Sequence, residues 1–242
     1  MRSKRARIDR FLCQQLSISR RQAQWIIAEG RVCIDANVVD SIQQMVDQFS
    51  HVTLDGHVLQ SQKPYYIQLN KPAGVVSATQ DSLHTTALDL LPDNYPDDLH
   101  IAGRLDVNST GLLLISNDGR WTKRLSDPNY QIQKHYLVEL DKPIHPELIE
   151  GFKKGLYFSY EGITTRPVRI NVITDRNVEV FLSEGRYHQI KRMFGHYRIK
   201  VIGLHRLAIG NLQLDATLKP GESRQLSEEE VANIFITPHC KK

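Results

Sequence analysis

The chain of 242 residues is long enough to bury a sizeable core, and its 40% hydrophobic and 24% charged residues are ordinary for a soluble globular protein. A net charge of +4 is only mildly basic, so composition alone gives weak support for a nucleic-acid partner. No apolar run approaches the ~20 residues that span a membrane, and Asp9 and Arg10 interrupt any signal-peptide segment. We therefore expect a cytoplasmic protein with no membrane partner.

The three cysteines and ten histidines show none of the spacings that hold a metal ion. Cys13, Cys33 and Cys240 are far apart and form no CxxC pair, so we expect free thiols or small apolar side chains in a reducing compartment. The histidines form no HExxH motif and no cluster with cysteine. The sequence therefore predicts no structural or catalytic metal.

Positive charge is concentrated at the start of the chain, where the first 31 residues carry eight Arg and Lys side chains against two carboxylates. Residues 1–7 are expected to form a basic arm. The apolar spacing over residues 8–16 predicts a short amphipathic helix. A capping box at Ser19 and Gln22 predicts a second helix, which ends at Gly30.

A strand-like alternation over 31–35 and a hairpin at 52–59 complete this first unit. Its segment SRRQAQWIIAEGRVCIDANVV, residues 19–39, resembles the S4 RNA-binding module, whereas the charges alone fit a solvated face equally well. The side chains that this resemblance places at RNA are Arg5, Arg20, Arg21, Gln24 and Arg31. We assign residues 1–60 to this small domain and 61–242 to a larger one, joined by a polar linker that ends in proline.

The larger domain is expected to begin with a strand over 65–69, a tight turn at 70–74 (NKPAG), a strand over 75–78 and a short helix over 85–91. The four apolar residues 112–115 then lie between a glycine and an Asn-Asp-Gly turn, which predicts a buried central strand. Asp106 precedes this strand on a short loop, where catalytic groups are usually carried. An aspartate that only caps a turn is the alternative.

Helical and strand-like segments alternate in the remainder of the chain without a regular βαβ rhythm. Helices are expected over 121–125 and 146–152, at the end of 183–194, and after a capping box at Ser227 and Glu230. Strands are expected over 134–140, 168–170 and 178–182, with shorter ones in 201–214 broken by Gly203 and Gly210. This order favours an α+β fold with a mixed, mainly antiparallel sheet flanked by helices.

Three motifs of this domain resemble those of pseudouridine synthases, in the branch that modifies ribosomal RNA and carries an S4 domain. They are GRLDVNSTGLLLISNDG at 103–119, KHYLV at 134–138 and SEGRYHQIKRMF at 183–194. The resemblance implies a pseudouridine synthase fold and the isomerisation of uridine to pseudouridine, which needs no redox cofactor, metal or ATP. It also implies that Asp106 is the catalytic residue, acting either as a nucleophile or as a base at the sugar.

The resemblance also assigns roles to further residues of the site. Lys191 would be the cation that keeps Asp106 ionised, although a surface lysine is the alternative. Tyr136 would lie against the uracil and help to remove the C5 proton, unless it is only a buried tyrosine. Arg104 would enter the space left by the flipped base, and a phosphate contact is nearly as good an interpretation. Leu105 and Ile190 would line the base pocket. Arg186, His188 and Arg192 would contact the RNA backbone or serve local structure, and none of the three would be catalytic.

The third motif and HIAGRLD are most similar to the branch that acts on small-subunit (16S) rRNA, because large-subunit (23S) relatives more often carry EGRNxxVRR. We therefore expect a monomeric 16S rRNA pseudouridine synthase, which acts on an assembly intermediate that contains ribosomal proteins. A 23S enzyme is the nearest alternative. A non-catalytic RNA-binding protein and a metal-dependent RNA hydrolase using Asp106 and Asp118 are alternatives from other classes.

Overall fold

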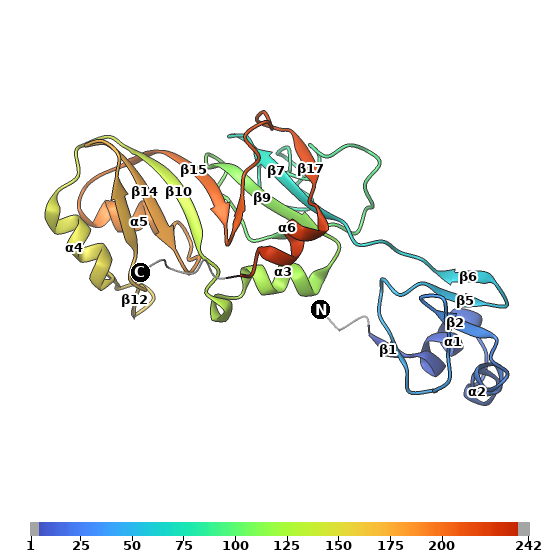
Figure 1. The fold of residues 1–242 in the computed structure, drawn as a ribbon. Helices are drawn as coiled ribbons and strands as arrows, with labels where there is room; N and C mark the ends of the chain where they lie inside the picture. Colours follow the sequence, from blue (N-terminus) through green and yellow to red (C-terminus); the bar gives the residue numbers. More distant parts are fainter. Residues whose placement is uncertain (1–4, 237–242) are drawn as a thin grey trace. The chain divides into compact units, whose positions relative to one another are not determined.

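The computed structural model describes residues 5–236, which form two compact units that divide between residues 64 and 65 (Figure 1). Residues 1–4 of the predicted basic arm and Cys240 lie outside the described residues. Within residues 5–236, no helix is long and apolar enough to cross a membrane. Each unit is considered separately below.

The N-terminal unit packs two helices, α1 (Ile8–Leu16) and α2 (Arg20–Ala28), against small sheets. A four-stranded antiparallel sheet has the order β3-β2-β5-β6, and β1 (Ala6–Arg7) pairs with β4 (Met45–Val46). The strands of the larger sheet are β2 (Val32–Ile34), β3 (Asn37–Val38), β5 (Val52–Leu54) and β6 (His57–Gln60). The expected arm is therefore wrong for residues 6 and 7, because β1 pairs with a strand distant in sequence. The capping box at Ser19 is confirmed.

The C-terminal unit is built on a nine-stranded sheet with the main order β13-β14-β10-β15-β9-β7-β17 (Figure 1). Only the β9–β15 pair is parallel among its described pairings, so the mixed, mainly antiparallel sheet is confirmed. The strands on this path are β13 (Arg169–Val172), β14 (Asn177–Leu182), β10 (Lys134–Leu140), β15 (Val201–Ile209), β9 (Thr110–Ser116), β7 (Tyr66–Lys71) and β17 (Ser223–Gln225). Strand β8 (His100–Ala102) pairs with β9, and β16 (Leu212–Gln213) pairs with β15.

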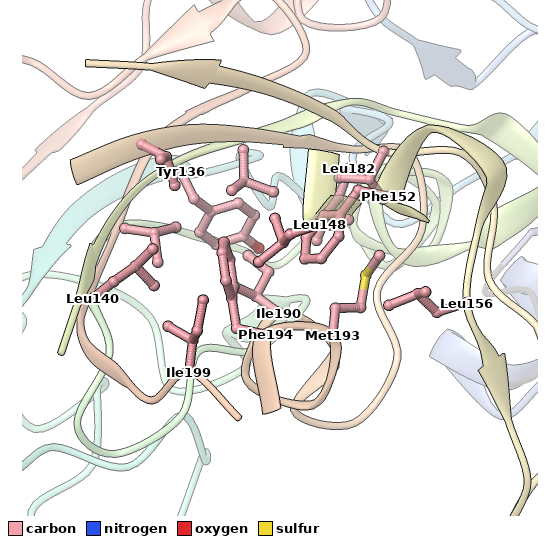
Figure 2. Packing of buried hydrophobic residues seen from close by; sticks show 14 of the residues in the cluster. Tyr136, Leu140, Leu148, Phe152, Leu156, Leu182, Ile190, Met193, Phe194 and Ile199 are labelled. Atoms are coloured by element: carbon pink, nitrogen blue, oxygen red, sulfur yellow. The ribbon is translucent and has the colours of Figure 1, made fainter. Parts of the chain in front are cut away.

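Helices and short elements complete this unit. They are α3 (Gly119–Ser126), a 3-10 turn (Pro128–Tyr130), α4 (Pro146–Lys154), the β11–β12 pair (Tyr157–Phe158 and Ile163–Thr164), α5 (Gln189–His196) and α6 (Glu228–Asn233). The start of α4 at its proline and the capping box of α6 are confirmed. One hydrophobic cluster joins β10 and β14 to α4 and α5, and Figure 2 shows Tyr136 and Ile190 within it.

Strand β9 lies at the centre of the sheet, as the apolar run predicts. Leu112, Leu113, Leu114 and Ile115 are each 0% exposed. Successive side chains point to opposite faces, so Leu112 and Leu114 join one hydrophobic cluster while Leu113 and Ile115 join another. Both faces of β9 are therefore covered, which explains why its apolar residues are consecutive instead of alternating.

Three local expectations are wrong. Residues 85–91 form no helix: Thr86 and Asp89 make the reciprocal hydrogen bonds of a capping box, but only one turn, with the Leu91 amide donating to Leu88 O, follows before Pro92. Residues 75–78 form no named strand, and only Val76 makes an isolated bridge to Thr86. Gly203 does not interrupt β15. The strand continues through it, and the pairing of β15 with β10 shifts register between Glu139 and Leu140.

Gly111 is required where β9 meets β15. Its φ is +99°, and an added Cβ would overlap the backbone oxygen and nitrogen of Arg206. We expect Gly111→Ala to lower the free energy of unfolding by about 3 kcal/mol or more, because backbone strain and a clash act together. Urea denaturation measures this, with Gly162→Ala as the control, since Gly162 also has a positive φ but faces open space. Equal decreases in the free energy of unfolding for Gly111→Ala and Gly162→Ala would contradict the close approach of Gly111 to the Arg206 backbone.

Candidate active site

A cavity of about 590 Å³ opens beside the start of β9, a volume in the range that holds a nucleotide-sized ligand. Its lining comes from segments distant in the sequence: residues 102–109, the beginning of β10, the turn at 185–188, the start of α5, and β15. The lining residues that the sequence predicts for the site are Arg104, Leu105, Asp106, Tyr136, Arg186, Ile190 and Lys191. The fold therefore gathers all of the expected catalytic and pocket residues in one cavity.

Asp106 is held between two nitrogen groups. Lys191 Nζ lies 2.9 Å from Asp106 Oδ2, and His188 Nε2 lies 3.3 Å from Oδ1. The Asp106 side chain retains 29% of its exposure, so the carboxylate is both paired and accessible from the cavity. The adjacent ammonium of Lys191 balances the charge of the carboxylate and fixes its orientation, which suits either proposed role at the sugar.

The loop that carries Asp106 is fixed by the NKPAG turn and the residues after it. Lys71 is 0% exposed, and its Nζ donates to the carbonyl oxygens of Pro72, Val107 and Ser109 at 2.8, 3.2 and 2.9 Å. Burial lowers the pKa of Lys71 to about 8. The lysine therefore links the NKPAG turn to the loop directly after Asp106.

Ser77 holds the other side of the same loop. Its Oγ donates to the Leu105 carbonyl at 2.8 Å and accepts from the Leu105 amide at 3.1 Å. Sequence reasoning placed NKPAG only as a turn and missed Ser77 entirely. Because these contacts join residues about 30 positions apart, no local pattern could have identified them.

Arg206 is a further residue that sequence reasoning missed. It is 3% exposed, donates from Nε to Leu112 O at 2.7 Å, and places Nη1 3.4 Å from both Tyr136 Oη and Arg104 O. It thus joins the central strand, the loop before it and the tyrosine. Arg206 follows Asp106 by about a hundred residues on β15, so only the strand pairing reveals the contact.

The remaining pocket residues divide into an apolar wall and a cationic edge. Leu105, Tyr136 and Ile190 are 6%, 8% and 4% exposed and belong to one hydrophobic cluster, which Figure 2 shows from close by. Arg104 is exposed. Burial, together with the nearby Arg206 guanidinium, lowers the pKa of Lys134, which also lines the cavity, to about 8. A planar apolar ring therefore fits the wall, and a negatively charged backbone fits the edge.

Asp118 does not join Asp106. It caps α3 by accepting from the amides of Arg120 and Trp121, and the seven-residue strand β9 separates the two aspartates by roughly 20 Å. Within residues 5–236, no group of three or more His, Cys, Asp or Glu side chains could hold a metal ion. The hydrolase alternative that uses both aspartates therefore has no assembled site.

Most of the arginines expected at RNA have carboxylate partners. Arg20 lies 3.0 Å from the buried Asp9, and Arg31 lies 2.6 Å from Asp55. In the other unit Arg186 lies 3.1 Å from Glu184, and both terminal nitrogens of Arg192 lie 2.6 Å from Glu161. Arg5 and Arg21 are exposed and Gln24 is half-buried. Local acidic partners thus reduce the positive charge that four of these arginines can offer to RNA.

Family models match both units. The RNA pseudouridylate synthase model matches residues 65–196, and the S4 domain model matches residues 6–52. The chain is 46%, 43% and 42% identical to proteins called ribosomal small subunit pseudouridine synthase A from Pseudomonas aeruginosa, Vibrio cholerae and Escherichia coli. These similarities cover 94–95% of the chain and 99–100% of each relative.

A solved structure shares the arrangement. A protein described as a pseudouridylate synthase superposes with a TM-score of 0.69 at 34% identity, covering 94% of this chain and 99% of the other. The similarity therefore extends over most of both units.

Proposed function

The chain belongs to the RNA pseudouridylate synthase family, and from that premise we propose that it isomerises a specific uridine of small-subunit (16S) ribosomal RNA to pseudouridine. The observation that carries the proposal is the accessible Asp106 carboxylate, held 2.9 Å from Lys191 in a cavity that also contains Tyr136. A paired carboxylate beside an apolar wall and a phenol suits a reaction at a sugar that carries a planar base.

The reaction exchanges one glycosidic bond for another. The bond between N1 and C1′ breaks, the uracil turns within the site, and C5 bonds to C1′. The C5 proton is then removed, and N1 ends protonated, so atoms and electrons balance without a redox partner. Asp106 acts at the ribose and Lys191 balances its charge. Tyr136 lies against the uracil and helps the loss of the C5 proton through its position, and Leu105 and Ile190 exclude water from the ring.

The small-subunit assignment is supported by identities of 42–46% over nearly the full length of relatives that carry that name. The experiment that tests it offers unmodified 16S and 23S rRNA to the protein in equal amounts and maps new pseudouridines in both. We expect modification at one position of the 16S rRNA. A product confined to 23S rRNA would replace the assignment with the large-subunit alternative.

We also propose a monomer that acts on a small-subunit assembly intermediate containing ribosomal proteins, and therefore in the cytoplasm, where ribosomes are assembled. Asp106, Tyr136 and Lys191 already lie together in one cavity of the C-terminal unit, which supports a monomer. The S4 unit supports binding to folded rRNA, because its exposed cations suit the phosphate backbone. The deciding comparison is the modification rate on free 16S rRNA against that on partly assembled particles.

Arg104 is proposed to fill the space that the flipped uridine leaves. Its side chain is exposed at the cavity while its backbone carbonyl is held by Arg206, so the side chain can extend from a fixed loop. Extrusion of a stacked base costs a few kcal/mol. We expect Arg104→Ala to slow single-turnover modification by about 10-fold or more on a structured target, and by much less on a target uridine that is already mobile. An equal loss on both substrates would assign Arg104 to phosphate binding instead.

A further inference from the structure

The turn between β14 and α5 contains a residue with unusual backbone geometry. His188 has φ +48° and ψ +32°, the left-handed region that residues other than glycine rarely adopt. Such a conformation persists only where the surroundings enforce it, and it occurs preferentially at functional sites. This turn lines the cavity that contains Asp106.

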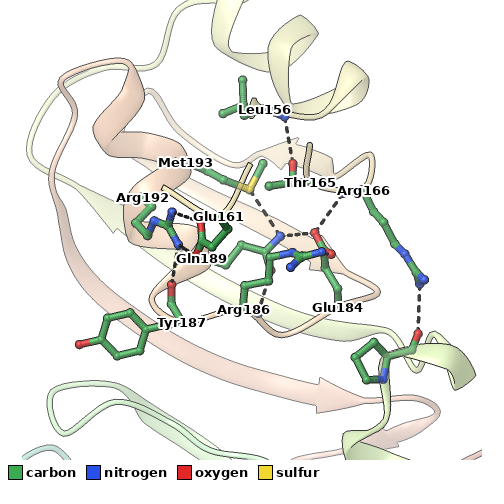
Figure 3. A network of polar contacts seen from close by, with 11 residues as sticks. Leu156, Glu161, Thr165, Arg166, Glu184, Arg186, Tyr187, Gln189, Arg192 and Met193 are labelled. Atoms are coloured by element: carbon green, nitrogen blue, oxygen red, sulfur yellow. Dashed lines mark hydrogen bonds and ion pairs between the residues drawn. The ribbon is translucent and has the colours of Figure 1, made fainter. Parts of the chain in front are cut away.

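A network of polar contacts fixes this turn (Figure 3). Glu184 is 4% exposed and accepts from Gln189 Nε2 at 2.6 Å and from Arg186 Nε at 3.1 Å. Gln189 Oε1 in turn accepts from the Arg186 amide at 3.1 Å. Arg192, which is bound to Glu161, also reaches the Tyr187 carbonyl at 3.5 Å. The backbone beside the cavity is therefore ordered before any ligand binds, which lowers the entropy cost of binding.

The network leaves the side chain of Tyr187 outside it. Figure 3 shows the Tyr187 ring directed away from the polar contacts, while its carbonyl takes part in them. The ring is 76% exposed and stacks on His188 with the centroids 3.9 Å apart and the planes inclined by 17°. His188 covers one face of the phenol, and the other face is free to take a second planar group.

The position of this stack relates it to the target nucleotide. His188 Nε2 lies 3.3 Å from Asp106 Oδ1, and Tyr187, which stacks on a face of the same imidazole, lines the same cavity. A nucleotide whose sugar reaches Asp106 would bring the next nucleotide of its strand to this edge. Single-stranded RNA is commonly bound by stacking of its bases on aromatic side chains.

We propose that the open face of Tyr187 stacks on the nucleobase adjacent to the target uridine in the rRNA. This inference rests on the proposed function, since it takes the occupant of the cavity to be a uridine within an RNA strand. The stack of base, Tyr187 and His188 holds the substrate strand next to the flipped nucleotide. Tyr187 is thus a binding residue for the sequence around the target and takes no part in the chemical step.

The test combines Tyr187→Ala with an abasic site placed on the 5′ or the 3′ side of the target uridine in a 16S rRNA fragment. Full-length protein is used, and single-turnover rates are measured against protein concentration. We expect Tyr187→Ala to raise the half-saturating concentration about 5- to 100-fold, because base stacking on an aromatic side chain has that range of effect. Tyr187→Phe and Tyr187→Trp should remain near the wild type, since both keep an aromatic face.

We expect an abasic site on one side of the target uridine, 5′ or 3′, to raise the half-saturating concentration of the wild type by a similar factor. The same abasic site should cause no further rise in Tyr187→Ala. The salt dependence of binding should be unchanged, because stacking releases no counterions. Tyr160→Ala is the matched control: Tyr160 is 95% exposed but does not line the cavity, and its loss should have no effect.

Two results would overturn the inference alone. One is that an abasic site weakens binding by Tyr187→Ala as much as it weakens binding by the wild type, whether it lies 5′ or 3′ of the target. The other is a Tyr187→Phe variant as weak as Tyr187→Ala, which would assign the effect to the hydroxyl. A wild-type protein that modifies neither the fragment, nor the full 16S rRNA, nor a partly assembled small-subunit particle would instead overturn the proposed function, and the stacking inference with it.

Discussion

Asp106→Asn is expected to reduce pseudouridine formation by at least about 10³-fold while leaving rRNA affinity nearly unchanged. The substitution keeps the shape of the side chain and removes its charge, so the protein loses the group that acts at the ribose. The amide can still lie beside Lys191 and His188, whose nitrogens contact the carboxylate at 2.9 and 3.3 Å. The fold of the loop should persist, because Lys71 and Ser77 hold it through backbone atoms.

Single-turnover modification and equilibrium binding measured on the same rRNA separate the two effects. Asp118→Asn is a suitable control, since that carboxylate caps α3 and does not line the cavity. Appreciable turnover in Asp106→Asn would remove this residue from the chemistry. If cells that carry only the Asp106→Asn variant behaved like wild-type cells, the non-catalytic RNA-binding alternative would be favoured.

Lys191→Met is expected to lower the single-turnover rate by about 10²-fold, because the carboxylate loses the ammonium that orients it and balances its charge. The Lys191 side chain is 33% exposed and Asp106 is 29% exposed, so water can partly replace the lost partner. The loss should therefore be smaller than for Asp106→Asn. This rate is measured at saturating protein by stopping the reaction at set times and quantifying the pseudouridine formed.

Lys191→Arg serves as the comparison, since it keeps the positive charge at the start of α5. We expect it to retain much more activity than Lys191→Met. Wild-type rates in Lys191→Met would instead make Lys191 a surface lysine, the alternative that the sequence left open. The double variant Asp106→Asn with Lys191→Met should be no worse than Asp106→Asn alone, because the two groups act as a unit.

The sequence predicted the site best where local pattern and family motif agreed. Residues 112–115 could be placed in a central strand because four consecutive apolar residues need cover on both faces. Lys191 could be assigned to Asp106 only through the resemblance, since a lysine on a helix has no local feature that marks a carboxylate partner distant in sequence. The distance of 2.9 Å between them supports the assignment physically.

The supporting residues could not be predicted, because their contacts depend on strand pairing. Arg206 reaches Leu112, Arg104 and Tyr136 only because β15 lies beside β9 in parallel, with Gly111 opposite Arg206. The missing helix at 85–91 has a different cause, since Thr86 and Asp89 form a capping box as at the start of a helix, but Pro92 follows after a single turn. Tyr187 was passed over because exposed aromatic side chains carry no periodic signal.

We propose that the cavity around Asp106 alone carries out the isomerisation in small-subunit rRNA. To test this, purified protein is incubated with unmodified small-subunit rRNA, both free and in assembly intermediates. The buffer contains a metal chelator under conditions that leave the RNA folded. Pseudouridines are then mapped at single-nucleotide resolution. We predict one new pseudouridine in 16S rRNA with the wild type and none with Asp106→Asn. The absence of any new pseudouridine with the wild type on every substrate, or an equal yield from Asp106→Asn, would contradict the account.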